Sequence, residues 1–320
     1  MVTNMKKMVA IVLLLLISTA LLISLGSTSS AQTEPRIHIL SDGSVDPADV
    51  PIHRNGDLYI LTDNICAQIV VNKDNIIIDG AGYTLYGSYN GTRTDSWVVG
   101  QGSDQEYTDT LPWTIGIDLA NKDRHDLTIK NLNIKNFYIG TYLYTSNNTI
   151  TDCALSDNIV GILLSGDSNT ITSNYIARNE EGIFFGVNNP GDEPLNIILT
   201  HNSFVDNIVH FSGCFCEGYN TTEAVHTWDD GEEGNYWSDY KGTDTDGDGV
   251  GDTPYVIDVQ NQDRYPLMQS VASQPTATPK FLVEAIIAAI ALPVIITATV
   301  STYRKRNKKT SENTENVINT

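Results

Sequence analysis

The segment LTIKNLNIKNFYIGTYL (residues 127–143) is followed, at a step of 21 residues, by NTITDCALSDNIVGILL (148–164) and NTITSNYIARNEEGIFF (169–185). A fourth copy, ILTHNSFVDNIVHFS (198–212), enters the same register once the seven residues 188–194 are removed. Repetition at a period of about 20–50 residues indicates one small structural unit that buries its surface against neighbouring copies. The repeat therefore decides the fold.

Within each copy, apolar and polar positions alternate over very short stretches. One apolar column holds Ile129, Ile150 and Ile171, and the column beside it holds Lys130 and Thr151. Such alternation is typical of half-buried strands. A pair of helices needs about 33 residues or more, so a 21-residue unit excludes a helical repeat. The pattern predicts an all-β fold: a right-handed parallel β-helix with coils of about 21 residues.

Three further columns are read from the repeat. One contains only glycine: Gly140, Gly161 and Gly182. Two contain asparagine: Asn174 with Asn202, and Asn158 with Asn179 and Asn207. Stacked amides can hydrogen-bond from coil to coil and satisfy corner backbone groups, so we expect the asparagines to be structural.

The repeat also sets the domain boundaries. An earlier coil begins at Asn75, which places the β-helix at residues 75–216 with a long insert at 87–113. Residues 32–74 are expected to cap the first coil, because an open end of a β-helix is an unpaired sheet edge. Residues 217–269 form a closing segment.

Both ends of the chain carry apolar segments. Residues 1–31 resemble a secretory signal peptide, with an uncleaved anchor as the alternative. A Pro- and Thr-containing linker (270–280) leads to an apolar segment (281–303) long enough to span a bilayer. The basic tail (304–320) predicts a cytoplasmic C-terminus and an extracytoplasmic, cell-surface β-helix.

The exported part of the chain is strongly acidic. The whole chain has a formal net charge of −20, and residues 32–279 hold 11 Lys and Arg against 36 Asp and Glu. Such a surface repels nucleic acid and anionic polysaccharide and attracts cations.

Four cysteines are present: Cys66, Cys153, Cys214 and Cys216. Export permits disulfides, but the pairing cannot be read from the sequence. Cys153 falls in an inward column, so we expect a buried thiol. Three glycosylation acceptor sequences occur, at Asn90, Asn147 and Asn220.

An aspartate-rich run suggests a calcium site. Asp244, Asp246, Asp248 and Asp252 resemble the front half of a calcium-binding loop, in which carboxylates two residues apart wrap around the ion. The twelfth position is Tyr255 rather than glutamate, so an EF-hand is not implied. The alternative is a solvated acidic loop.

Imidazoles and thiols gather near the last coil. His210 takes the glycine position of its coil, and Cys214 and Cys216 follow closely, a combination that suits copper or zinc. His201 and His226 lie nearby in sequence. No zinc-finger spacing is present, so scattered structural residues are the alternative.

The insert suggests a carbohydrate surface. Trp97 and Trp113 lie in it among several carboxylates, and aromatic faces beside carboxylates can bind sugars. The alternative is a lid whose tryptophans pack on the β-helix.

No catalytic residues are predicted. The outward columns of the repeat are read as containing no acid, Asp152 and Asp157 occupy corners, and Glu180 and Glu181 stand alone in one coil. A glycosidase needs two acids at a defined separation.

The closing segment carries a recognisable motif: GNYWSDY (234–240), DGDGVGDTPYVI (246–257) and DRYPL (263–267). With the coils, residues 75–267 resemble the NosD-like right-handed β-helix proteins, which are also described as carbohydrate-binding and sugar-hydrolase domains. The closing motif is similar to that of many archaeal surface proteins. The resemblance implies periplasmic copper delivery to nitrous oxide reductase, but no copper ligand can be matched residue by residue.

Together, these features predict a cell-surface β-helix held by one C-terminal membrane span. We expect a non-catalytic role, in carbohydrate binding or in the structure of the envelope, with glycans or other envelope proteins as partners. Two alternatives stay open: a polysaccharide-acting lyase or hydrolase, and a copper-handling protein.

Overall fold

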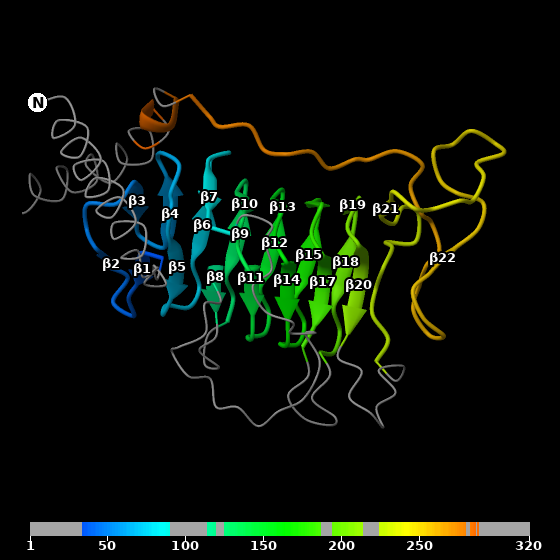
Figure 1. Ribbon diagram of the computed structural model, residues 1–320, viewed down its shortest axis with the longest axis horizontal. Coiled ribbons are helices and arrows are strands. Elements are labelled where there is room, and N and C mark those ends of the chain that lie inside the picture. Colours follow the sequence, from blue (N-terminus) through cyan, green and yellow to red (C-terminus); the bar gives the residue numbers. More distant parts are fainter. Residues whose placement is uncertain are drawn as a thin grey trace, which may run out of the picture. The chain divides into compact units, whose positions relative to one another are not determined.

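Each repeat folds into one coil of three short strands, and each strand joins a different sheet (Figure 1). The coil at the centre of the stack consists of β12 (Thr149–Thr151), β13 (Ala154–Ser156) and β14 (Val160–Leu164). The computed structural model describes residues 34–89, 114–119, 125–186, 194–213, 224–279, 282–285 and 287. Within these ranges it confirms the predicted parallel β-helix.

The strands form three stacked sheets and one small pair. The first sheet contains, in order, β2 (Val45–Asp46), β1 (Arg36–Ile39), β5 (Gln68–Val71), β8 (Ile115–Leu119), β11 (Ile139–Leu143), β14, β17 (Glu181–Phe185) and β20 (Val209–Gly213). The second contains β21 (Tyr236–Trp237), β19 (Ser203–Val205), β16 (Tyr175–Ala177), β13, β10 (Asn133–Lys135) and β7 (Thr84–Tyr86). The third contains β18 (Ile198–Thr200), β15 (Thr170–Thr172), β12, β9 (Thr128–Lys130), β6 (Ile77–Asp79), β4 (Leu58–Leu61) and β3 (Ile52–Asn55). Strands β22 (Tyr255–Val256) and β23 (Gln262–Asp263) pair with each other.

The register follows the 21-residue step. Ile150 pairs with Ile171, and Ile171 pairs with Leu199 in spite of the seven extra residues between them. These side chains are fully buried in the interior. Burial of each such side chain contributes about 1.5–3 kcal/mol, so the repeated apolar columns supply most of the driving force for folding.

Three corners separate the strands of a coil, and each corner has one residue with a positive φ. In the central coil these are Asn147, Asp152 and Asp157, with φ of 59°, 53° and 59°. Asparagine and aspartate enter this left-handed region at low cost because their short polar side chains bond nearby backbone. The corners therefore explain the polar breaks in the repeat.

The asparagine columns form the predicted ladders. Asn179 Oδ1 accepts from Asn158 N (3.0 Å) and Asn158 Nδ2 (3.1 Å), and Asn207 Oδ1 accepts in the same way from Asn179. In the other column, Asn202 Oδ1 accepts from Asn174 N (3.0 Å). Each amide is buried, so these bonds satisfy groups that would otherwise cost about 1–3 kcal/mol each.

Cys153 confirms the expectation of a buried thiol. Its side chain is fully buried in the main core, and burial raises its pKa to about 12. Cys66 is exposed, and neither cysteine forms a disulfide.

The two ends of the stack have their own pairing. Strand β1 pairs in parallel with β5 and antiparallel with β2, and β3 and β4 form an antiparallel pair. At the other end, β21 adds in parallel to β19. Trp228 and Trp237 of the closing segment are buried against the last coil.

Several predicted features lie outside the described residues: the signal peptide (1–31), most of the insert, and nearly all of the apolar segment (281–303) with its basic tail (304–320). Residues 282–285 form a short helical turn. Across the described ranges, no helix has the length and apolar character needed to cross a membrane.

Candidate functional site

The glycine column ends at His210, and this exchange creates a pocket. A Cβ atom on Gly140, Gly161 or Gly182 would lie 2.5 Å from a carbonyl oxygen of the following coil. Glycine is therefore required wherever another coil stacks on top. Strand β20 is the last strand of the first sheet, so the side chain of His210 has room at this position.

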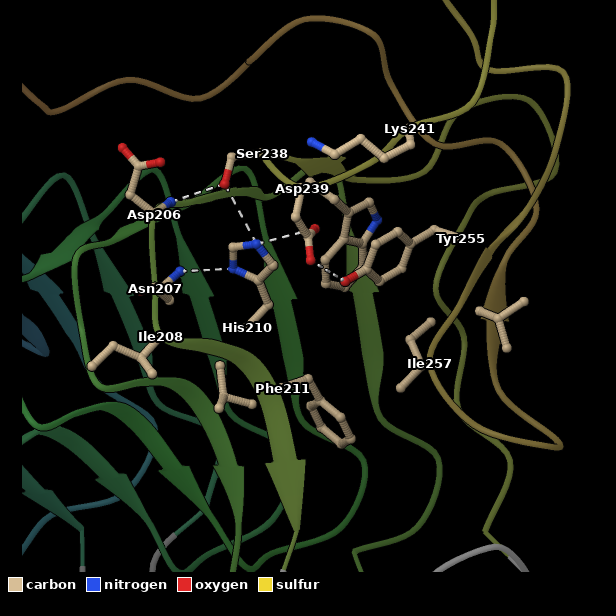
Figure 2. A pocket seen from close by; sticks show the side chains of 13 residues that line it. Asp206, Asn207, Ile208, His210, Phe211, Ser238, Asp239, Lys241, Tyr255 and Ile257 are labelled. Atoms are coloured by element: carbon tan, nitrogen blue, oxygen red, sulfur yellow. Dashed lines mark hydrogen bonds and ion pairs between the residues drawn. The ribbon is translucent and has the colours of Figure 1, made fainter.

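The asparagine ladder fixes the hydrogen-bonding state of His210. Asn207 Oδ1 accepts from Asn179, so the amide nitrogen of Asn207 faces the imidazole, and it lies 3.2 Å from His210 Nδ1. An amide nitrogen can only donate, so Nδ1 must accept and the ring proton resides on Nε2. The protonated nitrogen lies 3.2 Å from Asp239 Oδ1 and 3.4 Å from Ser238 Oγ (Figure 2).

Burial keeps this imidazole neutral. The side chain of His210 is only 7% exposed, and burial lowers its pKa even though Asp239 and Asp206 act in the opposite direction. The ring is therefore neutral and carries one proton. Because Asn207 holds one ring nitrogen and Asp239 the other, the orientation of the imidazole in the pocket is fixed.

Two stacked aromatic rings, Trp237 and Tyr255, line one wall, and Phe204 lies behind them in the core. Phe204 and Trp237 lie 4.4 Å apart between ring centroids and are nearly parallel, and Trp237 and Tyr255 follow at 4.2 Å. The hydroxyl of Tyr255 donates to Asp239 Oδ2 (3.3 Å), and burial raises the pKa of this phenol. Asp239 thus joins the aromatic wall to the imidazole.

We call the resulting cavity the terminal pocket. It has a volume of about 490 Å³, and its polar groups come from His210, Asp206, Ser238, Asp239 and Lys241. Its apolar rim consists of exposed or half-exposed residues: Ile208, Val209, Val256 and Ile257. An apolar rim around a few converging polar groups is typical of a small-ligand site.

Only part of this pocket is visible in the sequence. His210 replaces glycine in its column, but nothing in the repeat connects it with Ser238, Asp239 or Lys241, which lie in or beside the closing motif. That motif is the signal that the sequence offers for the rest of the pocket, although 23 residues of chain separate Gly234, where it begins, from His210. Only the stacking of β21 on β19 brings the two together.

The predicted calcium residues divide into two groups. Ligand atoms of Asp244, Asp246 and Asp248 all lie within 4.8 Å of one another. The backbone amides of Gly247 and Gly249 donate to Asp244 and hold the loop. An all-oxygen set suits calcium rather than copper.

Asp252 does not belong to this cluster. Its Oδ2 atom accepts from the hydroxyls of Thr243 (2.9 Å) and Thr245 (2.6 Å), and these bonds hold the pKa of Asp252 below its usual range. In the structure, Asp252 stabilises the loop by bonding to Thr243 and Thr245.

The structure places the histidines in separate surroundings. His201 Nε2 lies 3.4 Å from Asp230 Oδ2, at a corner of the last coil. His226 packs edge-on against Phe185, and burial lowers its pKa to about 4. Cys214 and Cys216, the thiols of the predicted copper or zinc group, lie outside the described residues.

Two acids face outward on the first sheet, in two different columns. Asp118 lies on β8 and Glu181 lies on β17, where its Oε2 accepts from Ser212 Oγ at 2.5 Å. Three inter-strand steps separate these strands, or about 14 Å along the stack. Glycosidase carboxylates lie about 5–10 Å apart, so these two acids do not form such a pair.

The remaining predicted site residues are the glycosylation acceptors and the two tryptophans of the insert. Asn147 is exposed at a corner, as a glycan acceptor requires, whereas Asn90 and Asn220 lie outside the described residues. Trp97 and Trp113 also lie outside them.

Comparison with protein families gives one match. The sequence model of a family described as periplasmic copper-binding protein (NosD) matches residues 60–242, more than half of the chain. The matched region begins in β4, includes all the regular coils and ends just after Lys241, which lines the terminal pocket. A comparison with curated proteins gives no match. Family match and stacked parallel strands agree, and the chain belongs to the NosD family.

Proposed function

We propose that this protein is a membrane-attached, extracytoplasmic β-helix that binds carbohydrate without catalysis, and that the terminal pocket is its binding site. The periplasmic description of the family supports a location outside the cytoplasm. The apolar segment 281–303, followed by its basic tail, supports attachment to the membrane.

The terminal pocket is the observation that carries the binding role. Carboxylates of Asp206 and Asp239 can accept from sugar hydroxyls, and Lys241 and His210 Nε2 can donate to them. The apolar rim suits the C–H faces of a sugar ring. A volume of about 490 Å³ accommodates one or two sugar units.

The wide spacing of the outward acids on the first sheet supports binding rather than cleavage. Among the described residues, the outward acids Asp118 and Glu181 are too far apart for glycoside hydrolysis. The polysaccharide-acting alternative predicts its catalytic groups in the insert, where Trp97 and Trp113 lie.

A glycan array probed with the purified chain in detergent tests the proposal. We expect binding to a restricted set of neutral or cationic glycans, because the surface is acidic. Asp239→Ala should weaken binding at least tenfold, since it removes both acceptor oxygens and releases the imidazole, whereas Asp244→Ala, outside the pocket, should leave binding unchanged. Equal binding by both variants, or release of reducing or unsaturated ends from envelope glycans, would contradict the proposal.

Copper is the second candidate, because the family description names it. The described residues do not fit a copper centre, because His201, His210 and His226 lie in separate surroundings. Within the described ranges, the group of acids, histidines or cysteines whose ligand atoms all lie within 4.8 Å of one another is the all-oxygen cluster of Asp244, Asp246 and Asp248. Copper handling by His210, Cys214 and Cys216 stays a prediction. Copper binding that is lost in Cys214→Ser/Cys216→Ser would support it.

A further inference from the structure

The segment that follows the closing motif does not leave the β-helix. Residues 271–279, which we call the strap, turn back across the second sheet (Figure 1). At its start, the amides of Val271 and Ala272 donate to Ser203 Oγ, at 3.2 Å and 3.1 Å. Ser203 begins β19, in the last coil.

The strap then reaches the first coil. Asn133 Nδ2, on β10, donates to the carbonyl of Pro275 (2.9 Å), and the amide of Thr278 donates to the carbonyl of Ala81 (2.7 Å), just before β7. Strands β19 and β7 are four inter-strand steps apart, or about 19 Å. The strap thus runs along the stack in the opposite direction to the coils.

The contact at the first coil is close. Gly82 has a φ of +80°, and a Cβ atom there would lie only 1.9 Å from the carbonyl oxygen of Thr276. The hydroxyl of Tyr83 donates to the carbonyl of Thr278 (3.2 Å). Beyond the strap, Val283 is 1% exposed and packs with the main core. The sequence predicted a spacer here, and the structure shows a docked segment.

We propose that the strap fixes the direction of the β-helix over the membrane, with the first coil toward the bilayer and the terminal pocket away from it. This inference rests on the proposed membrane attachment through residues 281–303. The helical turn that opens this segment starts from the carbonyl of Pro279, which accepts from the amides of Leu282 and Val283. The chain therefore enters its apolar segment beside the first coil.

A free linker of this length would not impose a direction. A flexible chain of about ten residues has an end-to-end distance near 17–19 Å, enough to let the domain reorient. Each docking hydrogen bond contributes about 1 kcal/mol, and two prolines lower the conformational entropy that docking must overcome. Docking directs the terminal pocket toward ligands outside the cell.

Hydrogen exchange on the full chain in detergent tests the docking itself. The amides of Val271, Ala272 and Thr278 should be protected, and Gly82→Ala should accelerate their exchange at least tenfold because its methyl group collides with the strap. Gly56→Ala is the matched control, since Gly56 has a similar φ (+64°) with nothing within 4 Å of the added carbon. Unprotected amides in the unaltered chain, or equal acceleration by both variants, would overturn the inference.

Fluorescence quenching in vesicles tests the direction. The dye is attached to the exposed Cys66 near the first coil or, in a Cys66→Ser background, to Val256→Cys at the pocket rim. Both proteins also carry Cys214→Ser/Cys216→Ser, and the vesicles contain a lipid with a headgroup quencher.

We expect stronger quenching at Cys66 than at Val256→Cys. Adding Gly82→Ala should reduce this difference by at least half, and adding Gly56→Ala should preserve it. Equal quenching at the two sites overturns the inference. Failure of the protein to float with vesicles is a separate result that refutes membrane attachment, whereas the exchange experiment in detergent still decides whether the strap is docked.

Discussion

The backbone amide of Asn235 donates a 2.7 Å hydrogen bond to Asp263 Oδ2, and this contact ends the ladder that begins at Cys153. Asp263 is fully buried and also accepts from Trp237 Nε1 (2.9 Å) and, through Oδ1, from the amide of Tyr265 (3.1 Å). Every group directed at it is a donor. A carboxylate, which only accepts, therefore completes a column that amides occupy in the coils.

Asp263→Asn should destabilise the protein by about 1–3 kcal/mol, because the amide nitrogen would face a donor and leave it unsatisfied. Denaturant unfolding of the two proteins measures the change. Asp246→Asn, at an exposed carboxylate in calcium-free buffer, serves as the control and should change stability little. Equal stability of the two variants would show that the ladder tolerates an amide at its end.

Gly161→Ala should cost about 3 kcal/mol, because the new methyl group would lie 2.5 Å from the carbonyl oxygen of Gly182 and the stack above cannot move away. His210→Ala, in the same column but on the end strand β20, over which no further strand of this sheet stacks, should be far better tolerated. Thermal unfolding of both variants makes the comparison. Similar losses would mean that the column does not limit stacking.

Lowering the pH from 7 to 5 should destabilise the protein partly through His226. Burial holds its folded pKa near 4, below the ordinary value of about 6.5, although the charge of Asp258 opposes the shift. Its contribution is fully present above about pH 6.5 and is lost as the pH falls toward 4, because the unfolded chain binds the proton first. His226→Phe keeps the ring packing against Phe185 and should flatten the melting temperature between pH 7 and 5. Parallel curves for the two proteins would exclude this cause.

Millimolar calcium should raise the melting temperature if the clustered carboxylates bind it. Asp244→Asn should abolish the rise, because it removes a member of the cluster that also holds the loop amides. Asp252→Asn should preserve it, since Asp252 bonds Thr243 and Thr245 instead. Calorimetric titration checks the binding, and the absence of both heat and a melting shift would leave a solvated acidic loop.

The repeat allowed the coils, their register and both asparagine ladders to be predicted, because identical columns must stack at a fixed spacing. Contacts between distant segments could not be predicted in this way. The bond between His210 and Asp239 and the docking of Pro275 on Asn133 join parts of the chain with no shared period. Asp118 was missed, and the outward direction of Glu181 could not be read, because the third strand of each coil is interrupted at glycine, which breaks the simple alternation of faces.

Because every coil has the same glycine column, the number of coils can change while the two ends of the β-helix stay the same. An inserted 21-residue coil would offer its neighbours the same carbonyls, amides and apolar side chains that those neighbours offered each other before. Both ends of the β-helix could therefore remain unchanged. An insertion of any other length must be accommodated outside the repeat, and the seven extra residues between β17 and β18 leave the pairing of Ile171 with Leu199 undisturbed. Duplication or loss of 21 residues is therefore the step by which such proteins can change the distance between the end of the strap, beside the first coil, and the terminal pocket.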